Sequence, residues 1–119
     1  MELPHLADRL AAILQRYPPA SKECVACARE VRQLLQSEGI AAEIVRVTHA
    51  LLGRYFYTQN GVCFAETGFH AAVQVNDLLI DALTGPIGKS QQEYYTLWRD
   101  IKPNELIFTP MELSDAPND

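Results

Sequence analysis

The chain has 119 residues, 48 % of them hydrophobic and 21 % charged, which predicts one globular domain with a single core. Its net charge is −5 and its Lys and Arg residues are scattered, so nucleic acid is not an expected partner. No apolar run approaches the roughly 18 residues that cross a bilayer, and three cysteines are an odd count for a disulfide framework. We therefore expect a domain over residues 1–111, a frayed acidic tail at 112–119, and no membrane partner. We also expect synthesis in a reducing cytosol, with delivery to other cells by a leaderless route as an option.

Two helices are predicted at the start of the chain. Apolar residues share one stripe over residues 3–17, and Pro18 and Pro19 end that segment because neither can donate to a helix ladder. Ser21 can cap the next helix, and Gly39 lies just past its end. In between, one helical face is apolar, and its members are Cys24, Cys27, Ala28, Val31, Leu34 and Leu35.

The apolar period changes to that of strands from Ile40 onward. A loop is predicted at residues 85–88 and a short helix at 90–99. Helices come first and strands later, which predicts an α+β fold with a mostly antiparallel sheet. The predicted strands include residues 44–45 and cover 55–57, 62–65, 70–75, 78–81 and 106–109.

One predicted hairpin places a histidine near an aspartate. If residues 76–77 form a two-residue turn, one face of the hairpin is continuously apolar. On the other face, His70 and Asp81 are diagonal neighbours with Cα atoms about 7–8 Å apart, which their side chains can bridge. An Asp–imidazole hydrogen bond fixes the tautomer and leaves the second ring nitrogen for a thiol. The facing apolar pairs in this register are Val75 with Leu78, Val73 with Ile80, and Ala71 with Ala82.

Cys24 is the candidate nucleophile. It falls in the first turn of the predicted helix, where the helix dipole favours an anion, and a histidine partner would lower the thiol pKa further. Cys27 continues the apolar stripe and Cys63 lies in a predicted strand, so both are interpreted as buried structural residues. A thiolate, a base and an orienting carboxylate are what thiol-based acyl transfer requires.

Two alternatives use the same cysteines differently. The sequence from Cys24 to Cys27 is a CxxC, which is typical of dithiol redox proteins, although such a motif normally follows a strand. A zinc site formed by Cys24, Cys27, Cys63 and His70 is conceivable, but the chain has no second close-spaced ligand pair.

Other candidates receive structural interpretations. We interpret His5 and His49 as surface or structural residues. The aromatic residues Tyr94, Tyr95 and Trp98 are interpreted as the packing face of the short helix.

The chain resembles the papain-like and transglutaminase-like superfamily in two regions. The segment of residues 24–42 begins Cys24-x-x-Cys27-Ala and ends Gly-Ile-x-Ala42, which resembles the nucleophile helix and Gly-Ile-Pro-Ala-like turn of the transglutaminase core, with Ala41 in place of proline. The segments Gly-Phe-His70 and Leu-Ile-Asp81 resemble the family's histidine and aspartate strands.

More narrowly, residues 21–88 are similar to small bacterial papain-fold toxin domains. The resemblance implies Cys24 as nucleophile, His70 as general base and acid, and Asp81 as its orienting residue. In papain-like enzymes a side chain shortly before the cysteine, often Gln, supplies an oxyanion donor. Here the nearest, Gln15, lies nine residues upstream.

We therefore expect a papain/transglutaminase-like α+β fold, with helices packed on an antiparallel sheet, and a cysteine-dependent amide hydrolase or acyl transferase. The reaction could be proteolysis, deamidation or acyl transfer, and no cofactor or metal is implied. The resemblance to toxins implies a protein or peptide substrate and a neutralising immunity protein as a partner. The alternatives are a non-catalytic protein-binding module on the same fold and a CxxC redox protein.

Overall fold

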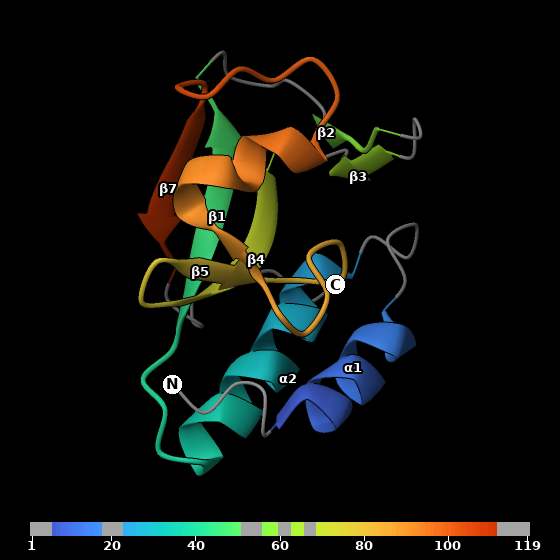
Figure 1. The fold of residues 1–119 in the computed structure, drawn as a ribbon, viewed down its shortest axis with the longest axis vertical. Helices are drawn as coiled ribbons and strands as arrows, with labels where there is room; N and C mark the ends of the chain where they lie inside the picture. The colour runs from blue at the N-terminus through green and yellow to red at the C-terminus, as the bar shows by residue number, and fades with distance from the viewer. Residues whose placement is uncertain (1–5, 18–22, 51–55, 60–62, 66–68, 112–119) are drawn as a thin grey trace.

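The computed structural model describes residues 6–17, 23–50, 56–59, 63–65 and 69–111. Two helices, α1 (Ala7–Arg16) and α2 (Cys24–Ser37), lie side by side at one end of the molecule in Figure 1. The strands that follow build a five-stranded antiparallel sheet above them. This is the α+β arrangement that the sequence predicts, with the helices first and the sheet second.

Both helices form where the apolar period predicts them, and they bury that stripe. Helix α1 buries Leu10, Ile13 and Leu14. The proposed stop at Pro18 and Pro19 and the proposed cap at Ser21 lie outside the described residues. The buried residues of α2 are Val25, Cys27, Ala28, Val31, Leu34 and Leu35, five of which belong to the predicted stripe.

The predicted end of the second helix is confirmed at Gly39, which has a positive φ of 77°. Its N–H donates to Gln36 O at 3.0 Å, and the N–H of Ile40 donates to Leu35 O at 2.9 Å. These two bonds satisfy the last carbonyls of α2 in a Schellman motif, which requires the left-handed backbone that glycine adopts without a Cβ penalty.

The main sheet has the strand order β6-β5-β4-β1-β7, with every pairing antiparallel. A separate pair, β2 with β3, is joined to the rest by an isolated bridge between Thr58 and Trp98. Strand β6 is too short for sequence periodicity to identify. The strands are β1 (Glu43–His49), β2 (Phe56–Tyr57), β3 (Cys63–Ala65), β4 (Phe69–Val75), β5 (Leu78–Ile80), β6 (Lys89–Ser90) and β7 (Leu106–Pro110).

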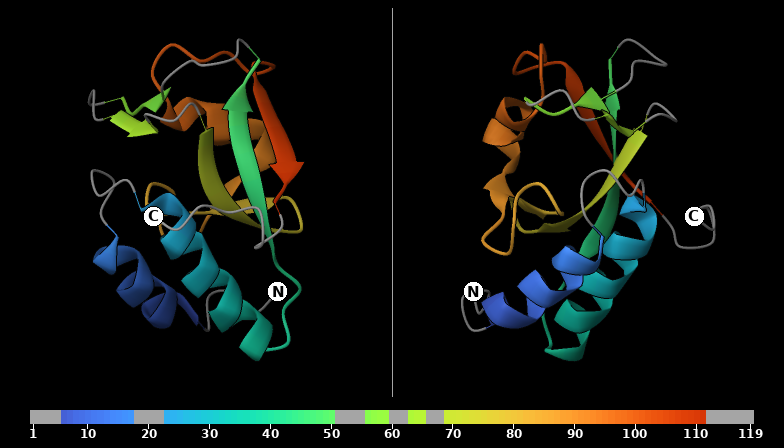
Figure 2. Two further views of the ribbon diagram at one scale, coloured as in Figure 1. Left: turned by 180° about the vertical axis from the view of Figure 1, so that it is seen from behind. Right: turned by 90° about the vertical axis from the view of Figure 1, so that its right-hand side faces the viewer.

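The sheet is covered on both faces (Figure 2). One face packs on α1 and α2. The other packs on η3 (Gln91–Leu97), a 3-10 helix that stands where the sequence predicts a short helix. Strand residues alternate between the two layers because successive side chains of a strand point to opposite faces. The helix layer takes Ile44, Ala71, Val73, Val75 and Ile80 from the sheet, and the η3 layer takes Val45, Val47, Ala72 and Leu79.

The predicted hairpin register is confirmed near the turn, where Val75 pairs with Leu78 and Val73 with Ile80. Asn76 adopts the positive φ, 57°, that the turn needs. The prediction was wrong further along: β5 ends at Ile80, so Asp81 is not a strand residue. The extended pairing as far as Ala82 does not form, because residues 81–84 turn away from β4.

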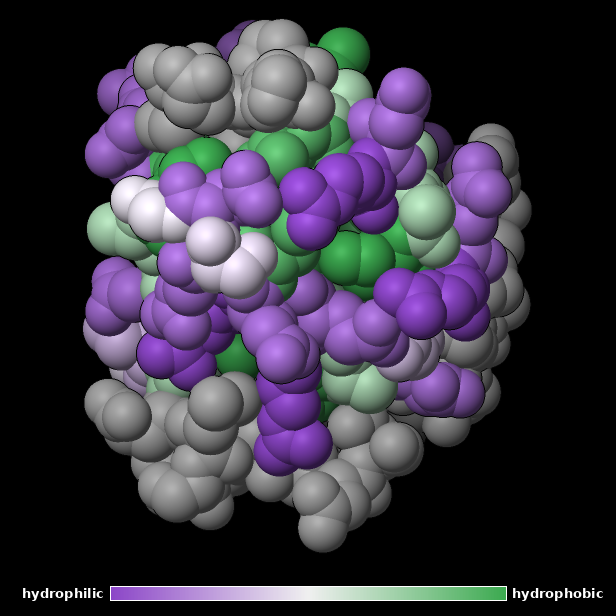
Figure 3. All heavy atoms as spheres, turned by 90° about the horizontal axis from the view of Figure 1, so that it is seen from below, coloured by the Kyte–Doolittle hydropathy of each residue, from purple (hydrophilic) through white to green (hydrophobic). Residues whose placement is uncertain are grey.

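The outer sides of the helices are polar and meet solvent. Arg9 forms an ion pair with Glu38 at 3.2 Å and Arg16 with Glu30 at 2.6 Å, each linking α1 to α2. Seen from below, the described surface mixes hydrophilic side chains with smaller apolar areas (Figure 3). Within the described ranges, no helix is both long and apolar enough to span a bilayer.

Candidate active site

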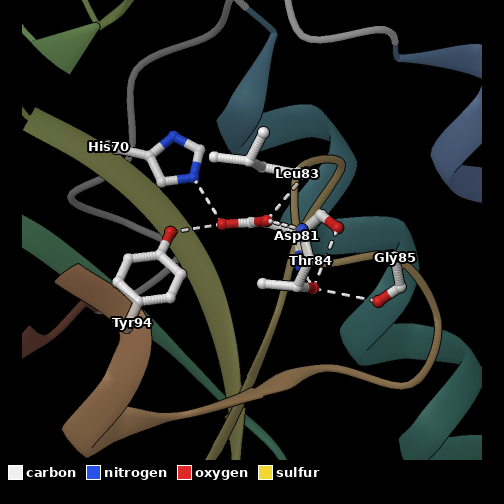
Figure 4. A network of polar contacts seen from close by, with 6 residues as sticks. All are labelled: His70, Asp81, Leu83, Thr84, Gly85 and Tyr94. Atoms are coloured by element: carbon white, nitrogen blue, oxygen red, sulfur yellow. Dashed lines mark hydrogen bonds and ion pairs between the residues drawn. The ribbon is translucent and has the colours of Figure 1, made fainter. Parts of the chain in front are cut away.

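His70 lies near the start of β4 and is only 1 % exposed. The backbone of β4 runs beside β1 at this point, where His70 is the partner of Val47. Its side chain is on the η3 face of the sheet, and its Nε2 is 2.9 Å from Oδ2 of Asp81 (Figure 4). The predicted contact between these two residues is therefore present, although a turn and not a strand delivers the aspartate.

Asp81 is held by the turn that it opens. Its Oδ1 accepts hydrogen bonds from the backbone N–H groups of Leu83 and Thr84, both at 2.8 Å. Its own N–H donates to Oγ1 of Thr84 at 3.0 Å. An aspartate that binds backbone N–H groups two and three residues ahead stabilises a turn, which explains why β5 stops one residue earlier. The carboxylate is 4 % exposed, so these bonds replace water.

Tyr94 is a member of the site that sequence reasoning missed. It comes from η3, is fully buried, and donates a hydrogen bond from its hydroxyl to Oδ2 of Asp81 (Figure 4). The predicted packing role is also present, since the Tyr94 ring lies edge-on to Trp98 and Phe108, with ring centroids 6.0 and 5.9 Å apart. A tyrosine on an apolar helix face is a weak signal, because the sequence does not say what its hydroxyl reaches.

The environment shifts the pKa values of the histidine and the aspartate in opposite directions. Burial alone would lower the pKa of His70, but hydrogen bonds with Asp81 and Cys24 and the charges of both residues raise it to about 9. Burial alone would raise the pKa of Asp81, but its hydrogen bond and charge interaction with His70 and its bonds with Tyr94 and Thr84 hold it below the ordinary value. Both shifts favour the charged forms of the pair, an imidazolium and a carboxylate.

Cys24 is the first residue of α2 and is half-buried. Its hydrogen bond with His70 is one of the interactions that raise the histidine pKa. Asp81 binds Nε2, so Nδ1 is the other ring nitrogen of the imidazole. The structure thus brings together Cys24, His70 and Asp81, the three residues singled out from the sequence.

Cys27 has the environment predicted for a core residue. It is 4 % exposed, and burial, followed by the charge of Asp81, raises the pKa of its thiol to about 12. Cys24 and Cys27 do not form a disulfide in this structure. The Cys63 side chain, interpreted from the sequence as structural, lies outside the described part of the structure. Two thiols one helical turn apart therefore differ sharply in environment.

His5 and His49 are the two other histidines of the chain, and the zinc hypothesis concerns His70 and the cysteines. His5 lies outside the described residues. His49 is 1 % exposed at the end of β1, 3.4 Å from Glu105, which fits the structural role predicted for it and not a surface one. Within the described ranges, no group of three or more His, Cys, Asp or Glu residues could hold a metal ion.

A cysteine at a helix start, a histidine on an antiparallel sheet and an aspartate in the turn after a neighbouring strand are arranged as in the papain-like class of α+β folds. Residues 5–96 match the family described as papain fold toxin 2, and this match spans most of the chain. The chain therefore belongs to that family and is a toxin domain of the papain fold. Among curated proteins and among solved structures, none matches the chain.

Proposed function

We propose that the chain is a cysteine-dependent amide hydrolase or acyl transferase, with Cys24 as nucleophile, His70 as general base and acid, and Asp81 as its orienting carboxylate. The observation that carries the proposal is the buried contact of His70 Nε2 with Asp81 Oδ2 at 2.9 Å, together with the Cys24 interactions that help to raise the pKa of the same histidine. An imidazole whose pKa is raised to about 9 is protonated at neutral pH. A positive charge beside the sulfur, together with the start of α2, favours the thiolate.

The proposed reaction passes through an acyl-enzyme. The Cys24 thiolate attacks the carbonyl carbon of an amide, and the C–N bond breaks as His70 gives its proton to the departing amine. The neutral imidazole then takes a proton from water or from an acceptor amine, which attacks the thioester and releases Cys24. Asp81 stabilises the imidazolium at both stages without itself taking the proton, as the carboxylate of a triad does.

The toxin family supports a protein or peptide as substrate and an immunity protein as neutralising partner. Proteolysis, side-chain deamidation and transamidation share the acyl-enzyme and differ in which amide is attacked and which acceptor resolves it. Mass spectrometry of target proteins, incubated with and without a primary amine, would separate the three outcomes as a cleaved chain, an acid in place of an amide, or an amine adduct.

The proposal is tested by site-resolved alkylation with iodoacetamide at about pH 6. An ordinary thiol with a pKa near 8.5 is under ~1 % thiolate there, so a thiolate paired with imidazolium reacts far faster. We expect rapid modification of Cys24, slow modification of Cys27 in the same molecule, and loss of the rapid reaction in His70→Ala. Slow labelling of Cys24 that is indifferent to His70→Ala would exclude the thiolate–imidazolium pair and favour a non-catalytic binding module.

A further inference from the structure

The Asp81 carboxylate is bound by three parts of the chain: its own turn at Oδ1, and β4 and η3 at Oδ2. Its own turn supplies the two backbone N–H groups that bind Oδ1. The second oxygen, Oδ2, binds His70 and also accepts a hydrogen bond from the Tyr94 hydroxyl, which comes from η3 on the same face of the sheet. Only the second oxygen meets the histidine, so whatever fixes Oδ2 also fixes the imidazole.

Backbone bonds to Oδ1 hold the aspartate from one end of its carboxylate. The carboxyl group rotates about its last bond in a broad, twofold well and its two oxygens move together, so donors at both oxygens narrow this rotation more than donors at one. A donor placed at Oδ2 narrows it from the end that meets His70. Tyr94 is such a donor, and its ring is held between the edges of Trp98 and Phe108.

We propose that Tyr94 is a positioning residue, whose hydroxyl locks the Asp81 carboxylate in the orientation that holds His70 toward Cys24. The inference rests on the proposed function, since it assigns a role at the same site. Tyr94 acts through Asp81, and its effect on Cys24 is transmitted by His70.

Burial makes the arrangement obligatory for both partners. Tyr94 is 0 % exposed and Asp81 is 4 % exposed, so neither the hydroxyl nor the carboxylate can turn to water. A buried hydroxyl or carboxylate without a partner is strongly unfavourable, which couples the position of each group to that of the other. His70 lies on the same face of the sheet as Tyr94, and its ring centroid is 5.4 Å from that of Trp98 in an edge-on arrangement. Trp98 therefore packs against both His70 and Tyr94, the two side chains that bind Asp81 Oδ2.

The test compares Tyr94→Phe with Tyr95→Phe. Both changes remove only a hydroxyl from η3, and Tyr95, a half-buried neighbour, is the matched control. The readout is the rate of Cys24 alkylation by iodoacetamide from about pH 5 to pH 10, with site-resolved mass spectrometry. We expect Tyr94→Phe to lower the rate at about pH 6 roughly tenfold, the value of one hydrogen bond to a charged group, and to shift the pH profile. Tyr95→Phe should keep the wild-type profile.

A purely structural role for Tyr94 gives a different result. Tyr94→Phe would then lower the melting temperature while Cys24 kept the wild-type rate at every pH, and that outcome would overturn the proposal. Failure of the proposed function is separately visible, because wild-type Cys24 would then label slowly and His70→Ala would change nothing. The inference alone fails when wild-type Cys24 labels rapidly and Tyr94→Phe does too.

A measurement on the wild-type protein tests the inference even if the Tyr94→Phe variant does not fold. Burial, followed by the charge and hydrogen bond of Asp81, raises the pKa of Tyr94 well above its ordinary value near 10. With ¹³C-labelled tyrosine, the Cζ signal of Tyr94 should therefore stay constant through roughly pH 10, where exposed tyrosines titrate. Its hydroxyl proton should exchange slowly enough to be seen. A Tyr94 signal that titrates normally would show that the hydroxyl does not bind Asp81, and the inference would fall.

Discussion

The two faces of the sheet differ in what they bury. The face toward α1 and α2 is a continuous apolar layer. Both helices, the strands β1, β4 and β5, and Met111 just after β7 contribute to it. The face toward η3 is also apolar, but it encloses His70 and Asp81, two of the buried polar residues of the described chain, and the hydroxyl of Tyr94. Apolar packing is non-directional and tolerates small shifts, whereas hydrogen bonds among buried polar groups fix distances and angles. We infer that the helix layer chiefly stabilises the fold and that the η3 layer chiefly sets the geometry of the site.

The largest effect is expected from Asp81→Asn, which changes both stability and reactivity. An amide has one acceptor oxygen, so it can satisfy either the two backbone N–H groups or the His70 and Tyr94 side, but not both. We expect a loss of about 3–5 kcal/mol in the free energy of unfolding, measured by urea denaturation, because a buried charged pair is broken. The rate of Cys24 alkylation at about pH 6 should also be lower in Asp81→Asn than in the wild type. A stable variant with wild-type labelling would refute the assigned division between the layers.

Leu35→Ala tests the opposite face. Leu35 is fully buried against the sheet on the helix side, and its truncation should reduce the free energy of unfolding by about 2–4 kcal/mol through lost burial and a residual cavity. Under conditions where the variant remains folded, Cys24 should be alkylated at the wild-type rate and with the wild-type pH dependence. A changed pH profile in Leu35→Ala would mean that the two layers are coupled.

The smallest of the three effects is a pH dependence that belongs to the η3 layer alone. The folded pKa of His70 is raised above 6.5, so its stabilising contribution is complete below about pH 6.5 and is lost as pH rises through about 9. Cys24 is among the causes of this shift, so the comparison is made between Cys24→Ala and Cys24→Ala/His70→Gln, in which the thiol is absent.

Without Cys24, only Asp81 raises the histidine pKa, and the lost contribution should be about 1–2 kcal/mol between pH 6 and pH 10. Urea denaturation across this range supplies the measurement. The stability difference between the two chains should shrink as pH rises. A difference that stayed constant would indicate that His70 is neutral in the fold.

The sequence predicted much of this architecture because its signals are local. The helical stripe of α2, the positive φ at Gly39 and the pairing of Val73 with Ile80 all follow from periodicity and turn chemistry within a few residues. The proximity of His70 and Asp81 was also predicted, from the alternation of side chains along a hairpin.

The remaining features depend on tertiary contacts. The early end of β5 depends on Asp81. Its side chain can bind the N–H groups of a turn, or its backbone can continue the pairing with β4, and the sequence suits both options. Tyr94 depends on the path of the chain between Asp81 and η3, which includes a two-residue strand that no periodicity can show. A second buried layer over the sheet was likewise not predicted, because its members are scattered from Val45 to Phe108.

The polar half of the site is assembled from near neighbours along the chain. The contact of His70 with Asp81 spans 11 positions and that of Tyr94 with Asp81 spans 13. Closing loops of this length costs little more entropy than closing a tight turn, so the hairpin, its turn and η3 can come together early in folding. Cys24 comes from a distant helix, and the hydrogen bonds of Asp81 with His70, Tyr94 and its own turn do not involve it. A chain that lacks the thiol should therefore retain the same fold and surface, which makes Cys24→Ala a suitable inert bait for a substrate or an immunity protein.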